Sequence, residues 1–259
     1  MAAVLAAAAA GATLALSLRF TWWRPRKAGT PILMYHAVAP RRRGSRLNHW
    51  RLREEDLARQ LELLARRGME GVALRDLVGR PAAPEKRAVL TFDDGYAGVL
   101  ERALPLLRAR GFSATVFVVS GKLGGENDWD GETPGDRLLT AAGVRALAAE
   151  GIEIGSHGAT HRALPPLSDA ELDDEVRGSK AALEAVLGAP VVSFCYPYGA
   201  FDDRVVEAVR AAGYRAATVI RGGISPDLSD PFRLERIAVR GTNTLLDFSL
   251  ALTRGRSRL

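Results

Sequence analysis

Residues 88–119 read AVLTFDDGYAGVLERALPLLRARGFSATVFVV, and this stretch contains the pattern that decides the fold. Ala88–Phe92 and Ala114–Val119 are short apolar runs, which are typical of buried strands. Between them, Gly98–Arg110 reads as a helix that ends at Gly111. A strand, a helix and a second strand in succession predict two parallel strands that are joined by a crossover helix.

The same alternation is expected along most of the chain and indicates an α/β protein. It brings the strand count to about seven, which favours a barrel, with an open doubly wound sheet as the alternative. The long stretch Gly121–Asp136 has no clear period, and long loops in compact domains are often functional. Further strands are expected at Pro31–Val38, Ile152–Ile154, Val191–Phe194, Ala216–Ile220 and Ile237–Arg240. Further helices are expected at Glu54–Arg67, Thr140–Glu150, Asp169–Leu187, Asp203–Ala212 and Leu245–Leu252.

The composition is that of a globular protein. Of the 259 residues, 47% are hydrophobic and 25% are charged, which excludes a disordered or fibrous chain. The formal charge of +6 suits an anionic partner, but much of the excess lies in the short basic runs 24–27 and 41–43. No recognition motif accompanies these runs, so nucleic-acid binding is not expected. Cys195 is the only cysteine, which excludes an intrachain disulfide and a cysteine-rich zinc site.

The N-terminus has the composition of a membrane-embedded segment. Residues 2–18 carry no charge, and Trp22, Trp23 and a basic cluster follow. This length is at the short limit for spanning a bilayer, and interfacial tryptophans with basic residues are typical anchors. We therefore expect residues 1–27 to form a membrane anchor or a signal segment, and residues 28–259 to form the domain.

Two other interpretations of the N-terminus stay open. A cleaved signal peptide would lack the usual basic start, since nothing before Arg19 is positive except the terminal amine. An Ala-rich helix packed on the domain, or a start codon assigned too early, is the third interpretation. The basic flank favours a cytoplasmic domain, whereas a polymeric glycan substrate requires a secreted or membrane-anchored domain outside the cytoplasm, so the orientation stays open.

Two adjacent carboxylates and two histidines follow predicted strands. Asp93 and Asp94 come directly after Ala88–Phe92, where parallel α/β folds place their active sites. Alone, an Asp-Asp-Gly sequence is more often a solvated turn. His157 and His161, in SHGATH, have a spacing that can present two imidazoles to one metal. Two imidazoles and one carboxylate form the usual catalytic zinc set, and the second carboxylate can act as a base toward water, so the pattern predicts a metal-dependent hydrolase.

Two further residues are weaker candidates on local grounds. Tyr198, in YPYG, follows another predicted strand and can offer its N–H to an oxyanion, because Pro197 has none to give. A plain turn at the end of the strand explains that motif equally well. His36 ends the first predicted strand, where a buried structural histidine is the commoner interpretation.

The segments TFDDGY, SHGATH and YPYG resemble the motifs of the polysaccharide deacetylase family, which is also called the NodB-homology domain or carbohydrate esterase family four. The resemblance extends from Pro31 to Val239, with the core motifs between residues 88 and 240. It implies a distorted (β/α)7 barrel. It also implies that Asp93 is the general base and that Asp94, His157 and His161 bind a metal, usually zinc.

The resemblance also implies roles for the weaker candidates. The equivalent of Tyr198 supplies an oxyanion N–H, and many members begin this motif with an arginine that orients the base. This chain has Cys195 there, so we expect Arg236 to replace the arginine from the last strand. Gly158 also departs from the usual Ser or Thr. The chain has no histidine after His161, as in the poly-N-acetylglucosamine deacetylase-like subgroup, whose early Tyr-His segment resembles Tyr35-His36 and makes His36 the general acid.

We therefore expect a hydrolase that removes N-acetyl groups from the sugar units of a polysaccharide, with a divalent metal as cofactor. Zinc is expected, although cobalt and nickel accept the same ligands. One alternative is removal of a formyl or acetyl group from a lipid-linked sugar. Another is a glycan-binding relative without activity, against which the complete set of metal ligands and base argues. The sequence does not choose among poly-N-acetylglucosamine, peptidoglycan and chitin oligomers.

Overall fold

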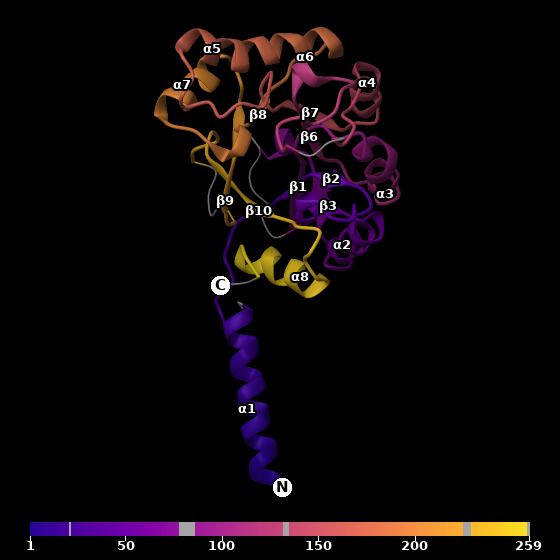
Figure 1. Cartoon of the computed structure of the whole chain (residues 1–259), viewed down its shortest axis with the longest axis vertical. Coiled ribbons are helices and arrows are strands. Elements are labelled where there is room, and N and C mark those ends of the chain that lie inside the picture. Colours follow the sequence, from indigo (N-terminus) through magenta and orange to yellow (C-terminus); the bar gives the residue numbers. More distant parts are fainter. Residues whose placement is uncertain (21, 78–85, 132–134, 225–228, 258–259) are drawn as a thin grey trace.

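Seven parallel strands close into a barrel in the computed structural model, which describes residues 1–20, 22–77, 86–131, 135–224 and 229–257 (Figure 1). The strand order is β1-β10-β9-β8-β7-β6-β5, and pairing between β1 and β5 closes the ring. The expected barrel is thus confirmed, and the open doubly wound sheet is wrong. The strands are β1 (Ile32–Tyr35), β5 (Arg87–Phe92), β6 (Thr115–Val118), β7 (Glu153–Ser156), β8 (Ser193–Cys195), β9 (Ala216–Gly222) and β10 (Leu234–Ala238).

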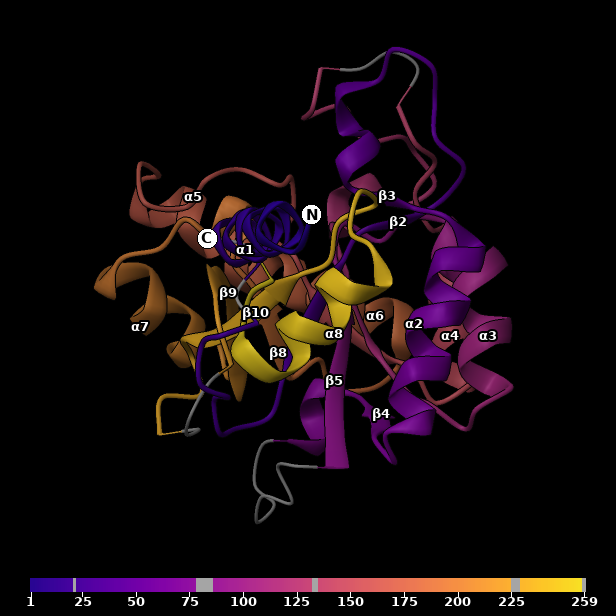
Figure 2. The ribbon, with the colours of Figure 1, turned by 90° about the horizontal axis from the view of Figure 1, so that it is seen from below.

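Helices surround this barrel (Figure 2). Their starts follow the sequence signals, since Ser168 and Thr244 both form capping boxes at the helices that they precede. Two expected helices contain π-helical turns, at Val99–Ala103 and Asp174–Gly178, and such turns are frequent near functional sites. The helices are α2 (Glu54–Arg66), α3 (Leu104–Arg108), α4 (Ala141–Ala149), α5 (Asp169–Asp173), α6 (Ser179–Leu187), α7 (Asp203–Ala211) and α8 (Leu245–Arg254).

Side chains alternate between the two faces of the barrel wall. Leu33 and Tyr35 of β1 belong to the large core between strands and helices, whereas Ile32 belongs to the smaller cluster that also contains Val89 and Phe117. These side chains are fully or almost fully buried. Burial on both sides explains why the strands read as continuous apolar runs rather than as an alternating pattern.

Some strands differ from the expectation. The last strand lies at Leu234–Ala238 instead of Ile237–Arg240. Its charged residues interrupt the apolar run that is expected of a buried strand, although Arg236 is completely buried. The first strand stops at Tyr35, and β2 (Ala37–Val38) pairs instead with β3 (Arg51–Leu52). A short β4 (Glu70–Val72), which the sequence did not indicate, pairs with β5.

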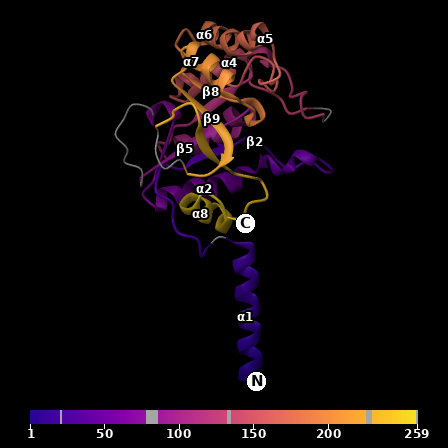
Figure 3. The ribbon, with the colours of Figure 1, turned by 90° about the vertical axis from the view of Figure 1, so that its left-hand side faces the viewer.

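The N-terminal α1 (Ala2–Arg19) projects away from the barrel (Figures 1 and 3). The segment after it is attached to α8, because Arg254 donates to the Trp22 carbonyl at 2.7 Å and the Lys27 N–H donates to the Thr253 carbonyl at 2.9 Å. Among the described helices, none has the length and apolar character needed to cross a membrane. The anchor or signal segment at residues 1–27 stays a prediction.

Candidate active site

The predicted site residues come together at the carboxyl ends of the barrel strands. Asp93 and Asp94 follow β5, His157 and His161 follow β7, Tyr198 follows β8, and His36 follows β1. All six line one pocket of about 110 Å³. Arg236 of β10 lies behind it, against Asp93.

Asp94, His157 and His161 form a set of possible metal ligands. One oxygen of Asp94 lies 3.4 Å from Nε2 of His157 and 3.3 Å from Nε2 of His161. All three side chains are at least nine-tenths buried. Two imidazole nitrogens and one carboxylate oxygen that converge at this spacing suit zinc and similar divalent ions, so the residues fit the group that the sequence implied.

The charges of this triad also favour a bound cation. Burial by itself raises the pKa of Asp94, but hydrogen bonds from His157 and His161 outweigh it and hold the pKa well below its usual value. Burial lowers the pKa of His157, yet the Cys195 and Asp94 side chains beside it raise that pKa well above normal. The triad therefore attracts positive charge, which a metal ion supplies in place of a proton.

The His157 ring is oriented by the backbone. Its Nδ1 lies 2.7 Å from the carbonyl oxygen of Cys195. Because a carbonyl only accepts hydrogen bonds, Nδ1 carries the proton and donates it. Nε2 is therefore the ring nitrogen that faces Asp94 and is available to a metal, as in many metal-binding histidines.

The backbone is strained at this site. Of the described residues other than glycine, those with positive φ are Asp94 at 72°, His161 at 64° and Tyr198 at 56°, and all three line the pocket. A left-handed residue of this kind costs about 1–3 kcal/mol and persists only where its surroundings enforce it. The concentration of three such residues in one pocket is typical of a functional site.

Arg236 holds the Asp93 carboxylate with both ends of its guanidinium. The distances are 2.7 Å from Nη1 to Oδ1 and 2.8 Å from Nη2 to Oδ2. The remaining donors reach the Val219 carbonyl, the Thr91 hydroxyl and the Cys195 sulfur at 3.1, 3.0 and 3.1 Å. Burial raises the pKa of Asp93, but the guanidinium outweighs it and the net pKa is lowered. Asp93 is therefore a charged carboxylate with fixed orientation.

A buried glutamate that the sequence analysis missed supports the histidine loop. Glu175 lies in the π-helical turn between α5 and α6. Its Oε2 accepts the N–H groups of Ala159 and Thr160 at 2.8 and 3.0 Å, and its Oε1 accepts the Thr160 hydroxyl. An acidic residue within an amphipathic helix gave no signal of this contact.

Gly158 fits this loop because it lacks a side chain. Its φ is +79°, and a Cβ there would lie 2.8 Å from Oε2 of Glu175. We expect Gly158→Ala to lower the free energy of unfolding by about 1–3 kcal/mol in urea titrations. Gly178→Ala is the matched control, since Gly178 has helical φ and nothing within 4 Å of an added Cβ. Equal stability of the two variants would contradict this account of the loop.

His36 and Tyr198 line the same pocket. The half-buried His36 ring stacks on Trp50, with centroids 4.2 Å apart, and its Nδ1 has no hydrogen-bond partner among the described residues. Burial lowers the pKa of His36. The Tyr198 side chain is 51% exposed and meets the His161 ring edge-on at 4.6 Å.

Trp50, Trp129 and Asp130 also line the pocket, although the sequence analysis did not select them. Trp129 and Asp130 belong to the long loop Gly121–Asp136 that its length had marked as functional, of which residues 132–134 lie outside the described residues. Trp50 gave no signal, because it follows an irregular stretch. His49 does not line the pocket, and its Nδ1 lies 2.7 Å from the Arg46 carbonyl.

Comparisons with known proteins agree with this geometry. A YxkH protein of Bacillus subtilis, provisionally named a polysaccharide deacetylase, is 25% identical over 84% of this chain and 74% of its own length. A chitin deacetylase of Pestalotiopsis is 30% identical over 48% of this chain and 38% of its own. The structure of IcaB from Ammonifex degensii has the same fold, with a TM-score of 0.73, 22% identity, and coverage of 88% of this chain and 97% of that one.

A family model described as polysaccharide deacetylase matches residues 80–217, which is more than half of the chain. The match includes Asp93, Asp94, His157, His161 and Tyr198, whereas His36 and Arg236 lie outside it. The chain belongs to the polysaccharide deacetylase family.

Proposed function

We propose that the protein is a metal-dependent hydrolase that removes acetyl groups from N-acetylated sugar units of a polysaccharide. The observation that carries this proposal is the Asp94, His157 and His161 triad beside a carboxylate, Asp93, that Arg236 keeps charged and oriented. A base next to a metal-ligand set, at the end of a pocket open to solvent, is the arrangement that amide hydrolysis by activated water requires.

When bound, a divalent metal supplies Lewis-acid activation of water and of the acetyl carbonyl. Asp94, His157 and His161 would hold this ion. Asp93 accepts a proton from the attacking water, and Arg236 fixes both Asp93 oxygens while it does so. His36 donates a proton to the departing sugar nitrogen, and the Tyr198 N–H donates to the oxyanion. One water and one amide thus give acetate and a free amino sugar.

The N-acetylated sugar as substrate class is supported by the family and by the chitin deacetylase among the relatives. Zinc is the proposed ion because two imidazoles and one carboxylate form its usual catalytic set. Cobalt and nickel are expected to substitute for zinc, since they accept the same donors.

We expect activity to depend on a removable metal. The full chain should bind about one equivalent of zinc and release acetate from N-acetylglucosamine oligomers, and a chelator should abolish this release until zinc, cobalt or nickel is returned. His157→Ala should lose both metal and activity, whereas His49→Ala, outside the pocket, should keep its metal. Full activity of metal-free protein would overturn the proposal. Acetate release from a lipid-linked sugar, but not from the oligomers, would support a lipid-linked substrate in place of the polysaccharide.

A further inference from the structure

His161 differs from His157 in how its ring is held. Its Nδ1 is buried and has no hydrogen-bond partner within the described part of the chain. Metal-binding histidines usually donate this second N–H to a carboxylate or a carbonyl, which fixes the ring. Apart from Nε2, which faces Asp94, the described contacts of the His161 ring are with other rings: Trp129 stacks on one face at 4.4 Å with planes 28° apart, and Tyr198 and His157 contact it edge-on.

Trp129 therefore needs a fixed position, yet its loop contains little regular structure. Asn127 connects the middle of this loop to its end, because its side-chain oxygen accepts the backbone N–H of Asp136 at 2.5 Å. The Asn127 amide also donates to the Tyr96 hydroxyl and to Asp130, at 3.2 and 2.8 Å. Asn127 is almost completely buried, so these contacts are shielded from water.

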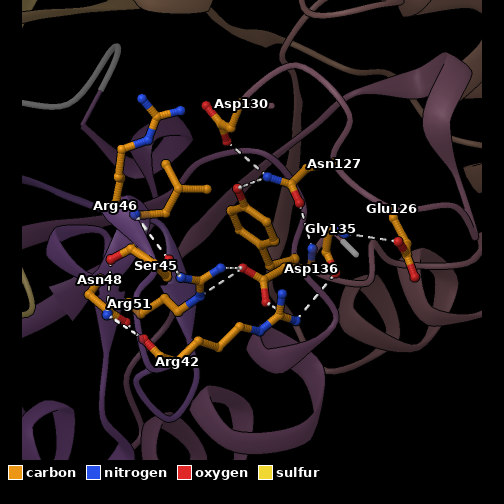
Figure 4. Close-up of polar contacts among 12 residues, drawn as sticks. Arg42, Ser45, Arg46, Asn48, Arg51, Glu126, Asn127, Asp130, Gly135 and Asp136 are labelled. Carbon is orange, nitrogen blue, oxygen red and sulfur yellow. Dashed lines mark hydrogen bonds and ion pairs between the residues drawn. The ribbon is translucent and has the colours of Figure 1, made fainter. Parts of the chain in front are cut away.

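Asp136 attaches this loop to a second one, residues 41–51 (Figure 4). Its carboxylate lies between two arginines: Arg51 contacts Oδ2 at 2.9 Å through Nε and at 2.7 Å through Nη2, and Arg42 contacts Oδ1 at 2.7 Å. Arg51 is 1% exposed. A buried guanidinium that is held at two points fixes direction as well as distance.

The second loop carries the other tryptophan. Trp50 immediately precedes Arg51 and stacks on His36. Two ion pairs, from Arg51 and from Arg42 to Asp136, thus join the two loops whose tryptophans cover His36 and His161. Both tryptophans line the same pocket as these histidines.

We propose that Asp136 is a positioning residue for this site: through Arg51 and Asn127 it holds Trp50 against His36 and Trp129 against His161. In this arrangement the stacked Trp129 ring replaces the hydrogen bond that Nδ1 of His161 does not make with any described residue. The inference rests on the proposed metal ligands, but not on the identity of the substrate.

The test is the zinc affinity of full-length variants, measured by competition with a chelating dye. Asp136→Ala should weaken zinc binding about tenfold or more, as loss of support around a metal ligand usually does. The matched control is Asp128→Asn, which removes an exposed ion pair with Lys122 from the same loop and should leave affinity unchanged. An affinity of Asp136→Ala within twofold of wild type, in a folded protein, would overturn the proposal.

Asp136→Ala removes the carboxylate that Arg51 and Arg42 contact and can fail to fold, so a second pair of variants is needed. Trp129 is only half-buried, and Trp129→Ala should weaken zinc binding as Asp136→Ala does, whereas Trp129→Phe keeps a stacking ring and should restore most of the affinity. Equal zinc affinity of the Ala and Phe variants would refute the role of stacking. Because affinity needs no turnover, this result is independent of whether acetate release is found.

The Trp50 half of the proposal has its own readout. At saturating zinc, Asp136→Ala should still show a lower kcat, because His36 has lost its support. Recovery of wild-type kcat at saturating zinc would contradict this half and leave only the Trp129 contact.

Discussion

Asp93→Asn is expected to lower kcat by about 10²–10⁴-fold, the usual contribution of a general base, while zinc still binds at about one equivalent. The amide keeps the shape of the side chain but cannot accept the proton from water. The proposed metal ligands Asp94, His157 and His161 are unchanged. Acetate release and zinc content of the same preparation check both halves of this expectation.

Asp173→Asn is the control for Asp93→Asn. It makes the same chemical change at an exposed carboxylate that pairs with Arg177 on the surface, and should leave kcat unchanged. If Asp93→Asn retained wild-type kcat, the base would have to be another group. If it lost its zinc, Asp93 would be a ligand rather than a base.

Arg236→Met is expected to lower the free energy of unfolding by about 3–5 kcal/mol, which is the usual result of leaving a buried charge without its partner. Asp93 is 2% exposed, and both of its oxygens lose a donor in this variant. The ion pair with Asp93 offsets much of the cost of burying the Arg236 charge, and the remaining hydrogen bonds of Arg236 are to uncharged groups. Urea unfolding followed by circular dichroism measures the loss.

The double variant Asp93→Asn with Arg236→Met separates charge pairing from packing. It removes both charges, so its stability should exceed that of Arg236→Met alone, with a coupling free energy of about 0.5–3 kcal/mol or more. Strictly additive losses would show that the two residues do not interact as the distances indicate.

The barrel and the core of the site could be predicted from the sequence because their signals are local. Each strand buried on both faces reads as an apolar run, and the polar residue that follows it lies at the carboxyl end of the barrel. Asp93, Asp94, His157 and His161 were found in this way. His36 and Tyr198 were weaker candidates on local grounds, to which the resemblance gave roles, and the resemblance added Arg236. The structure places all three at or behind the same pocket.

The features that were missed depend on contacts between distant segments. Glu175 supports residues 159 and 160 from a helix, and Asp136 pairs with Arg51 across 85 positions of the sequence. The charged pattern of β10 hid that strand, because the burial of Arg236 depends on contacts with distant residues such as Asp93. The two-residue strands β2 and β3 are too short to have a period of their own.

The most direct test of the central claim is to count the products from an N-acetylglucosamine oligomer that the zinc-loaded full chain has acted on. We predict acetate and free amine in equal amounts, with no new reducing ends, because Asp93 and the triad act on the amide and not on the glycosidic bond. New reducing ends without acetate, or no product at all from any N-acetylated sugar by zinc-loaded protein, would contradict the account.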